Sequence, residues 1–183
     1  MTRTPGVPAA QPTQADVRLG QSPSQTVGPF FHDALIRASD DVLVDEGVQG
    51  ERIVITGRVI DGGGNGVPDA MLEIWHADAS GIYPHPTDPD ARSVDPRFRG
   101  FGRARTDDTG RYRFETVKPG VSNADHGRFA PHVQVHVFAR GMLTHATTRI
   151  YFEGDDLRND EVLRLVDEDR RGTLVAKRDP RSR

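Results

Sequence analysis

The sequence contains no cysteine, and this absence removes several classes of chemistry. Without cysteine among its 183 residues there is no disulfide framework, no thiolate zinc site and no cysteine nucleophile. Long apolar runs are also missing, since no stretch approaches the roughly 20 residues that span a bilayer and the N-terminus lacks the apolar core of a secretory signal. We therefore expect a soluble, cytoplasmic protein.

Lysine is scarce as well. Of the 24 basic residues only Lys118 and Lys177 are lysines, and the arginines are scattered among 27 acidic residues. The net charge is -3, so the chain lacks the strongly basic field of a nucleic-acid-binding protein. We expect partners other than nucleic acid or membrane.

The length is that of one domain with a proper core. Residues 1–21 are rich in Pro, Ala, Gln and Thr without apolar periodicity, so we interpret them as a disordered leader preceding a folded domain over residues 22–183. The domain opens with an arm, residues 22–37, that carries Phe30 and Phe31 side by side. The two rings need cover, either from the chain's own body or from a partner subunit.

The body of the chain has the pattern of an antiparallel β-sandwich, an all-β fold with long loops and one short helix. Short β-branched and aromatic segments alternate with Gly/Pro turns such as "DGGGNGVPD". Residues 80–100 and 118–131 form long loops, which are usually functional in compact domains, and apolar spacing predicts the helix over 160–168. Strands are expected at 52–60, 70–77, 100–106, 111–117, 129–141, 145–154 and 172–178.

The stretch "FAPHVQVHVFARG" places His132, Gln134 and His136 on one face of a strand. Two ligands at positions i and i+2 lie about 6.6 Å apart and can share an ion, whereas His132 and His136 lie about 13 Å apart. The middle residue is an amide, a weak ligand for iron or zinc compared with imidazole. Tyr83 in the first long loop is more typical of a packing anchor than of a ligand. The residues alone favour a polar face over a metal site.

Five short segments of the sequence together resemble those of a known protein family. They are "PSQTVGPFF", "LEIWHADASGIY", "TDDTGRYRFETVKPG", "APHVQVHVFARG" and "TLVAKR", in this order from about residue 22 to 178. With them the chain resembles the intradiol ring-cleavage dioxygenases and, within that family, the α subunits of its α/β heteromers. The resemblance implies an antiparallel β-sandwich and a homologous, catalytic β subunit as partner.

The resemblance also implies a chemistry and a set of ligand positions. In catalytic chains of the family two tyrosines and two histidines bind non-haem Fe(III), and O2 opens a catecholate ring such as protocatechuate between its hydroxyl-bearing carbons. The matching positions here are Tyr83, Ser122, His132 and Gln134, so two of the four ligand types are lost. The resemblance therefore implies no metal in this chain and Fe(III) in the β subunit.

In such heteromers the α chain still lines the cavity of its partner. Carried over by position, the residues that reach the substrate are Thr26, Pro29, Phe30 and Arg140. Arg140 is the candidate for the substrate carboxylate, because a guanidinium pairs bidentately with carboxylates. The alternative role for Arg140 is a structural salt bridge within the chain.

Two other functions stay open at this point. A self-sufficient Fe(III) intradiol dioxygenase would need a second phenol, but Tyr112 and Tyr151 are expected on strands, away from the cavity loops. A prealbumin-like binding module would explain the sandwich but not the arm or the "FARG" block. Relatives usually continue after "TLVAKR" into a further strand pair, so we also expect an open sheet edge near the C-terminus.

Overall fold

The computed structural model describes residues 21–28, 30–124 and 127–180. The predicted leader falls almost wholly outside the described residues, as does Pro29. In the described part of the chain no helix is long and apolar enough to cross a membrane. The cytoplasmic location stays a prediction.

The larger of the two packed layers is a five-stranded sheet with the order β3-β2-β7-β8-β9. Neighbouring strands run antiparallel, except that β9 runs parallel to β8. Its strands are β2 (Met71–Trp75), β3 (Phe101–Arg105), β7 (His132–Phe138), β8 (Ala146–Phe152) and β9 (Val175–Ala176).

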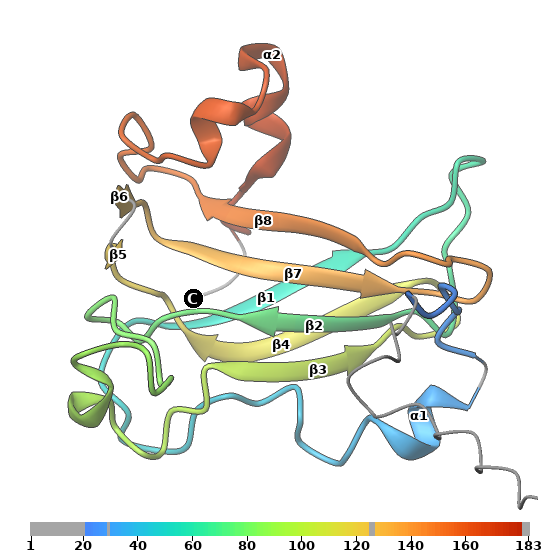
Figure 1. The fold of residues 1–183 in the computed structure, drawn as a ribbon, viewed down its shortest axis with the longest axis horizontal. Helices are drawn as coiled ribbons and strands as arrows, with labels where there is room; N and C mark the ends of the chain where they lie inside the picture. The colour runs from blue at the N-terminus through green and yellow to red at the C-terminus, as the bar shows by residue number, and fades with distance from the viewer. Residues whose placement is uncertain (1–20, 29, 125–126, 181–183) are drawn as a thin grey trace, which may run out of the picture.

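The second layer is the antiparallel pair β1 (Arg52–Arg58) and β4 (Arg111–Val117), which Figure 1 shows behind the larger sheet. Both layers contribute to one buried apolar cluster, as expected where one face of each sheet is covered by the other. This confirms the predicted sandwich. The buried members of the cluster are Leu43, Ile55, Leu72, Ile74, Ala104, Phe114, Val133 and Val135.

The two predicted long loops contain some regular structure. The first includes a short 3-10 helix, η2 (Ala91–Ser93). The second forms a small hairpin of β5 (Ser122–Ala124) and β6 (Gly127–Phe129), which the sequence pattern did not predict.

The helix expected over 160–168 is displaced and broken. That segment holds only a 3-10 turn, η3 (Leu163–Leu165), and a helix, α2 (Glu168–Arg171), begins where the predicted one should end. Asp160 accepts the backbone N–H of both Val162 and Leu163, and such side-chain bonds compete with a regular helix. A further 3-10 turn, η4 (Gly172–Leu174), leads into β9.

The arm carries a second short helix, α1 (Phe31–Ala34). The two adjacent phenylalanines at its start have different surroundings. Phe31 is 3% exposed, whereas Phe30 is 74% exposed. The arm thus packs one ring on the chain's own body and presents the other to the outside. The first alternative holds for Phe31, and cover of Phe30 by a partner subunit stays a prediction.

Candidate functional site

The residues singled out by sequence fall into two groups at opposite ends of β7. Strand β7 buries Val133 and Val135 in the core and turns His132, Gln134 and His136 to its outer face. We call the two groups the His132 end and the Arg140 end. The His132 end comprises Tyr83, Ser122, His132 and Gln134, and the Arg140 end comprises Thr26, Phe30 and Arg140.

At the His132 end three of the four predicted positions meet. The Tyr83 hydroxyl lies 3.4 Å from His132 Nε2, and Ser122 is near enough to act on the pKa of the same phenol. His132 Nδ1 lies 2.8 Å from the Ala130 carbonyl oxygen, so it must be the protonated nitrogen that donates this bond. Nε2 is therefore the acceptor for Tyr83.

Burial keeps both groups neutral. It lowers the pKa of the His132 imidazole, and the nearby Arg149 charge lowers it further. Burial also raises the pKa of the Tyr83 phenol, although Ser122 and Arg149 act in the opposite direction. The pair is a hydrogen-bonded phenol and imidazole.

Gln134, the fourth position, turns away from this pair. Its amide nitrogen lies 3.2 Å from His136 Nε2, and the His136 ring stacks on His145 at 4.9 Å between centroids. In the sheet Gln134 is aligned with Trp75 of β2 on one side and Arg149 of β8 on the other. The structure therefore places a cation next to the position where the sequence predicts a lost ligand.

Three residues at this end were missed by sequence: Arg149, Tyr151 and Asp160. Tyr151 lies on strand β8, as predicted, but its ring centroid lies 6.0 Å from that of His132, a contact that the sequence did not indicate. The two residues are direct partners in the β7–β8 register. The sequence could not supply this alignment, because it depends on how the two strands pair.

The buried Asp160 holds the Tyr151 side chain in place through a hydrogen bond. The phenol donates to Asp160 Oδ1 at 2.9 Å, and the nearby Arg149 acts to lower the pKa of the phenol. Burial, with Asp160 adding to it, raises the pKa of Tyr151 to about 12. Asp160 Oδ2 accepts the Ala130 N–H at 3.0 Å, so this carboxylate fixes the backbone just before β7.

The Arg140 end is built differently, on the surface. Thr26 Oγ1 accepts the Gly141 N–H at 3.1 Å and donates to the Ala139 carbonyl at 3.3 Å. The Thr26 hydroxyl thereby ties the arm to the turn after β7. Arg140 is 58% exposed and its Nε lies 2.5 Å from Asp69 Oδ2. The in-chain salt bridge considered from sequence is present, and Asp69 was not predicted.

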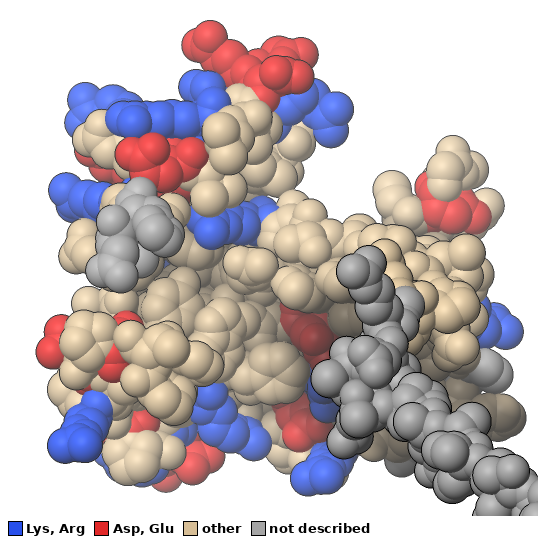
Figure 2. All heavy atoms as spheres, in the orientation of Figure 1, with Lys and Arg blue, Asp and Glu red and all other residues tan. Residues whose placement is uncertain are grey.

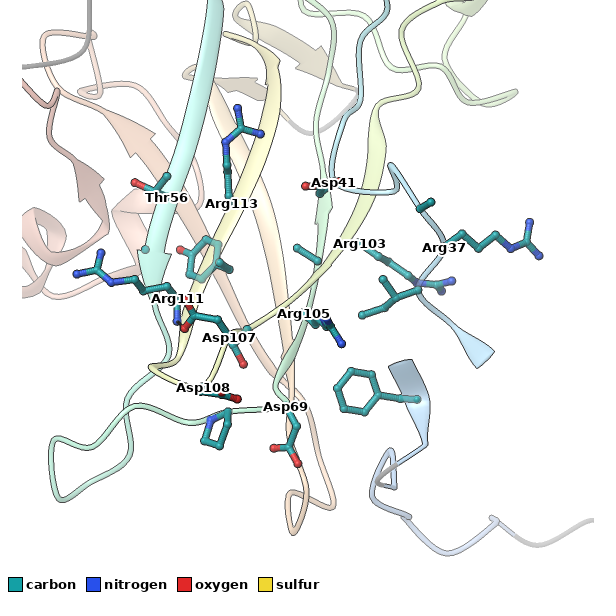
Figure 3. A pocket seen from close by; sticks show the side chains of 18 of the residues that line it. Arg37, Asp41, Thr56, Asp69, Arg103, Arg105, Asp107, Asp108, Arg111 and Arg113 are labelled. Carbon is teal, nitrogen blue, oxygen red and sulfur yellow. Dashed lines mark hydrogen bonds between the residues drawn. The ribbon is translucent and has the colours of Figure 1, made fainter. Parts of the chain in front are cut away.

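Two hollows adjoin Asp69. A shallow one of about 410 Å³ holds Arg140 and Asp69 together. A larger one of about 920 Å³ lies between the arm and β3–β4, and Figure 3 shows arginines and aspartates lining it from several elements. Arginine and aspartate are thus mixed around it, which gives the hollow no clear preference for an anion. Its charged lining residues are Arg37, Asp41, Asp69, Arg103, Arg105, Asp107, Asp108, Arg111 and Arg113.

Comparison with known proteins agrees with the observed fold and with the resemblance carried by the quoted sequence segments. A family model described as "Dioxygenase" matches residues 26–182. The protocatechuate 3,4-dioxygenase alpha chain of Burkholderia cepacia is 44% identical over 88% of this chain and 85% of its own length. This chain belongs to the intradiol dioxygenase family.

Other family members are similar over less of their length. The protocatechuate 3,4-dioxygenase beta chain of Burkholderia cepacia is 37% identical over 73% of this chain and 57% of its own. The solved catechol 1,2-dioxygenase of Acinetobacter sp. ADP1 superposes with a TM-score of 0.58 at 25% identity, and this chain covers 48% of it. The match to the alpha chain extends further along both partners than these two.

The iron of the dioxygenase family does not fit the residues at the His132 end. Tyr83 and His132 are hydrogen-bonded to each other, and the phenol of Tyr151 is already hydrogen-bonded to Asp160. The Arg149 guanidinium acts electrostatically on both Tyr83 and His132. A second cation there would be repelled by the first.

The surface between the two ends has few charges. Figure 2 views the molecule with the larger sheet in front, and uncharged atoms cover most of the middle of that face. Lysine and arginine gather with acidic side chains towards its borders. Any molecule that meets this face contacts uncharged surface between the two ends.

Proposed function

We propose that the chain is the non-catalytic α subunit of a protocatechuate 3,4-dioxygenase. In this proposal a homologous β subunit holds the Fe(III), and the complex cleaves protocatechuate with O2 to 3-carboxy-cis,cis-muconate, a step in aromatic catabolism of the β-ketoadipate type. The proposal rests on one observation at the His132 end, the charged side chain that lies beside the predicted ligand positions. A chain similar to an alpha chain over most of its length has an arginine beside its would-be ligands.

The Arg140 end is the part of the chain that we assign to the reaction. The Arg140 guanidinium is exposed and already paired with a carboxylate, that of Asp69. An incoming benzoate-type carboxylate offers the same planar, bidentate partner. We infer that Arg140 exchanges Asp69 for the substrate carboxylate in the partner's cavity and so orients the ring.

Thr26 and Phe30 support this role from the arm. The two Thr26 hydrogen bonds hold the arm against the backbone on both sides of Arg140. The exposed Phe30 ring is a ready apolar contact for a partner chain, because large exposed aromatics are typical of interfaces. Pro29, assigned to the same group, lies outside the described residues.

A self-sufficient dioxygenase is the weaker alternative. Tyr151 does supply a second phenol next to His132. That phenol is held by Asp160, and its neighbour Arg149 is positively charged. Freeing the phenol for a metal would remove one of the hydrogen bonds that the buried Asp160 carboxylate accepts, which is energetically costly.

The test is metal analysis of this chain alone and of its complex with the β chain from the same organism. We expect the complex to contain iron and to open protocatechuate, and the chain alone to contain no stoichiometric iron and to be inactive. As a control, the β chain alone is measured in parallel for iron and activity. One tightly held iron per chain in the isolated protein would overturn the proposal, and so would a failure of the two chains to associate.

A further inference from the structure

A cavity of about 580 Å³ opens at the His132 end, beside β8. Its volume falls in the range of small-molecule sites, roughly 300–1,000 Å³. One wall comes from the sheet, through Gln134 and Arg149, and the other from the segment after β8, through Val162, Val166 and Leu174. In Figure 1 this segment rises beyond β8 and carries α2.

Arg149 is incompletely satisfied within this wall. Its Nη1 atom is buried and has no hydrogen-bond acceptor. The nearest carboxylate oxygen, Asp160 Oδ1, lies 4.0 Å from Nη1. That oxygen already accepts the Tyr151 hydroxyl and two backbone N–H groups within 3.0 Å. Asp160 is therefore committed elsewhere, and a buried guanidinium N–H without an acceptor is unfavourable.

The groups around Arg149 compensate its charge only in part, through the Asp160 carboxylate 4.0 Å from Nη1. Tyr83 and His132 are neutral, and the ring under the guanidinium, Phe129 at 5.3 Å, contributes only a cation–π contact. At the cavity wall Arg170 and Asp167 add one charge of each sign. The lining charges thus sum to one net positive charge, that of Arg149.

We propose that this cavity is a binding site for a small organic anion, a monocarboxylate with an apolar body. The carboxylate would pair with the Arg149 guanidinium, whose Nη1 has no acceptor, while the apolar body would lie against Val162, Val166 and Leu174. The amide of Gln134 can supply a further hydrogen bond from the sheet. A guanidinium beside apolar side chains matches such a ligand in both charge and polarity.

This site is separate from the Arg140 end. Gln134, the residue of β7 that lines the cavity, and Arg140 are six residues apart along β7 and its following turn, about 20 Å at the rise of a strand. The inference therefore does not rest on the proposed function. A chain that assembles with no β subunit could still bind the carboxylate, and an active complex could fail to do so.

The only tryptophan of the chain is a built-in reporter for the cavity. Trp75 is aligned with Gln134 in the sheet and stacks on Tyr83 at 5.7 Å. We would titrate the full chain with cyclohexanecarboxylate, following Trp75 fluorescence and heat by calorimetry. Cyclohexanecarboxamide, which has the same body without the charge, is the matched control ligand. We expect saturable binding of the carboxylate and at least about tenfold weaker binding of the amide.

Three variants at two arginines locate the site. Arg149→Met removes the charge while keeping most of the side-chain volume, and we expect it to weaken the carboxylate by about tenfold or more. Arg149→Lys keeps the charge, and we expect it to bind within a few-fold of the wild type. Arg140→Met, at the other end of β7, should bind as the wild type does.

A second pair of variants leaves the arginine intact, in case Arg149→Met does not fold. Val166→Glu puts a negative charge in the cavity wall, and Val166→Gln is its neutral match. We expect only the glutamate to weaken binding. Equal affinity in Arg149→Met, loss of binding in Arg140→Met, equal effects of the two Val166 variants, or no saturable binding by the wild type would each overturn the proposal.

Discussion

The two ends of β7 hold their arginines in contrasting ways. At one end Arg140 is 58% exposed and meets Asp69 on the surface. At the other Arg149 is 18% exposed and stands 4.0 Å from a carboxylate, Asp160, whose side chain is fully buried. Surface pairs contribute at most about 1 kcal/mol to stability, whereas disrupting a buried charged network costs several. One arginine can exchange partners readily, while the other belongs to the internal framework.

The largest difference should appear when the same change is made at both ends. Asp160→Asn places an NH2 group among N–H and O–H donors and removes the charge beside Arg149, so we expect it to destabilise the fold by about 3 kcal/mol or more. Asp69→Asn removes the surface pair and should cost less than about 1 kcal/mol. Asparagine tolerates the positive φ of 57° at residue 69, so that comparison is free of backbone strain.

Urea unfolding of the two variants measures this difference. Asp156→Asn, which changes an exposed carboxylate paired with Arg158, is the control near the buried end and should behave like Asp69→Asn. If Asp69→Asn and Asp160→Asn cost the same, the distinction between a surface end and a buried end would be wrong.

The next largest effect concerns activity and depends on the proposed function. In the complex, Arg140→Met should raise the KM for protocatechuate by about tenfold or more, because the substrate carboxylate loses its partner. The KM for a catechol without a carboxylate should stay unchanged, and that substrate is the internal control. Asp69→Asn should leave the KM for protocatechuate equal or lower it, since the competing carboxylate charge is removed.

A rise of KM for both substrates in Arg140→Met would show that the residue supports the assembly and not the carboxylate. Arg140→Lys distinguishes the contribution of the charge from that of the bidentate geometry. It keeps the charge but not the bidentate geometry, so its KM for protocatechuate should fall between those of the wild type and Arg140→Met.

The smallest effect is a pH dependence confined to the buried end. His76 follows β2 and is fully buried, with Nε2 2.9 Å from Thr116 Oγ1 and Nδ1 2.7 Å from the Ala77 carbonyl oxygen. Burial, with a smaller contribution from the neighbouring His132, lowers the pKa of His76 from 6.5 to about 4, although the hydrogen bond to the Ala77 carbonyl acts in the opposite direction. The unfolded chain binds the extra proton first, so His76 favours folding above pH 6.5 and loses that contribution as the pH falls from 6.5 towards 4.

By pH 6 this linkage removes about 0.8 kcal/mol relative to pH 7.5. Unfolding free energies at the two pH values measure the loss, and the change should be smaller in His76→Gln, whose side chain does not titrate. His85→Gln, at an exposed position, is the matched control and should keep the wild-type difference. An unchanged difference in His76→Gln would contradict the assignment.

Much of the sandwich was predictable because its strands bury alternate residues. Val133 and Val135 point to the core as their spacing indicated, and the strand at 111–117 has the predicted bounds. The small hairpin of β5 and β6 was not predictable from apolar spacing, because its residues carry little of it. The helix over 160–168 was misplaced since Asp160 uses its side chain to organise the turn.

The site was half predictable for a related reason. Tyr83, Ser122 and His132 were named from resemblance, and they do meet. Arg149 and Tyr151 were missed, because only the β7–β8 register brings them opposite Gln134 and His132. Register is a property of two distant segments, and neither segment specifies it alone.

The length of β7 also has a consequence for how such a chain can change over generations. Sites separated by more than about 10 Å usually respond to substitution independently, and the two ends of this strand lie farther apart than that. Substitutions around His132 can thus accumulate without disturbing Arg140, and substitutions around Arg140 without disturbing His132. The strand acts as a spacer that allows each end to change independently of the other.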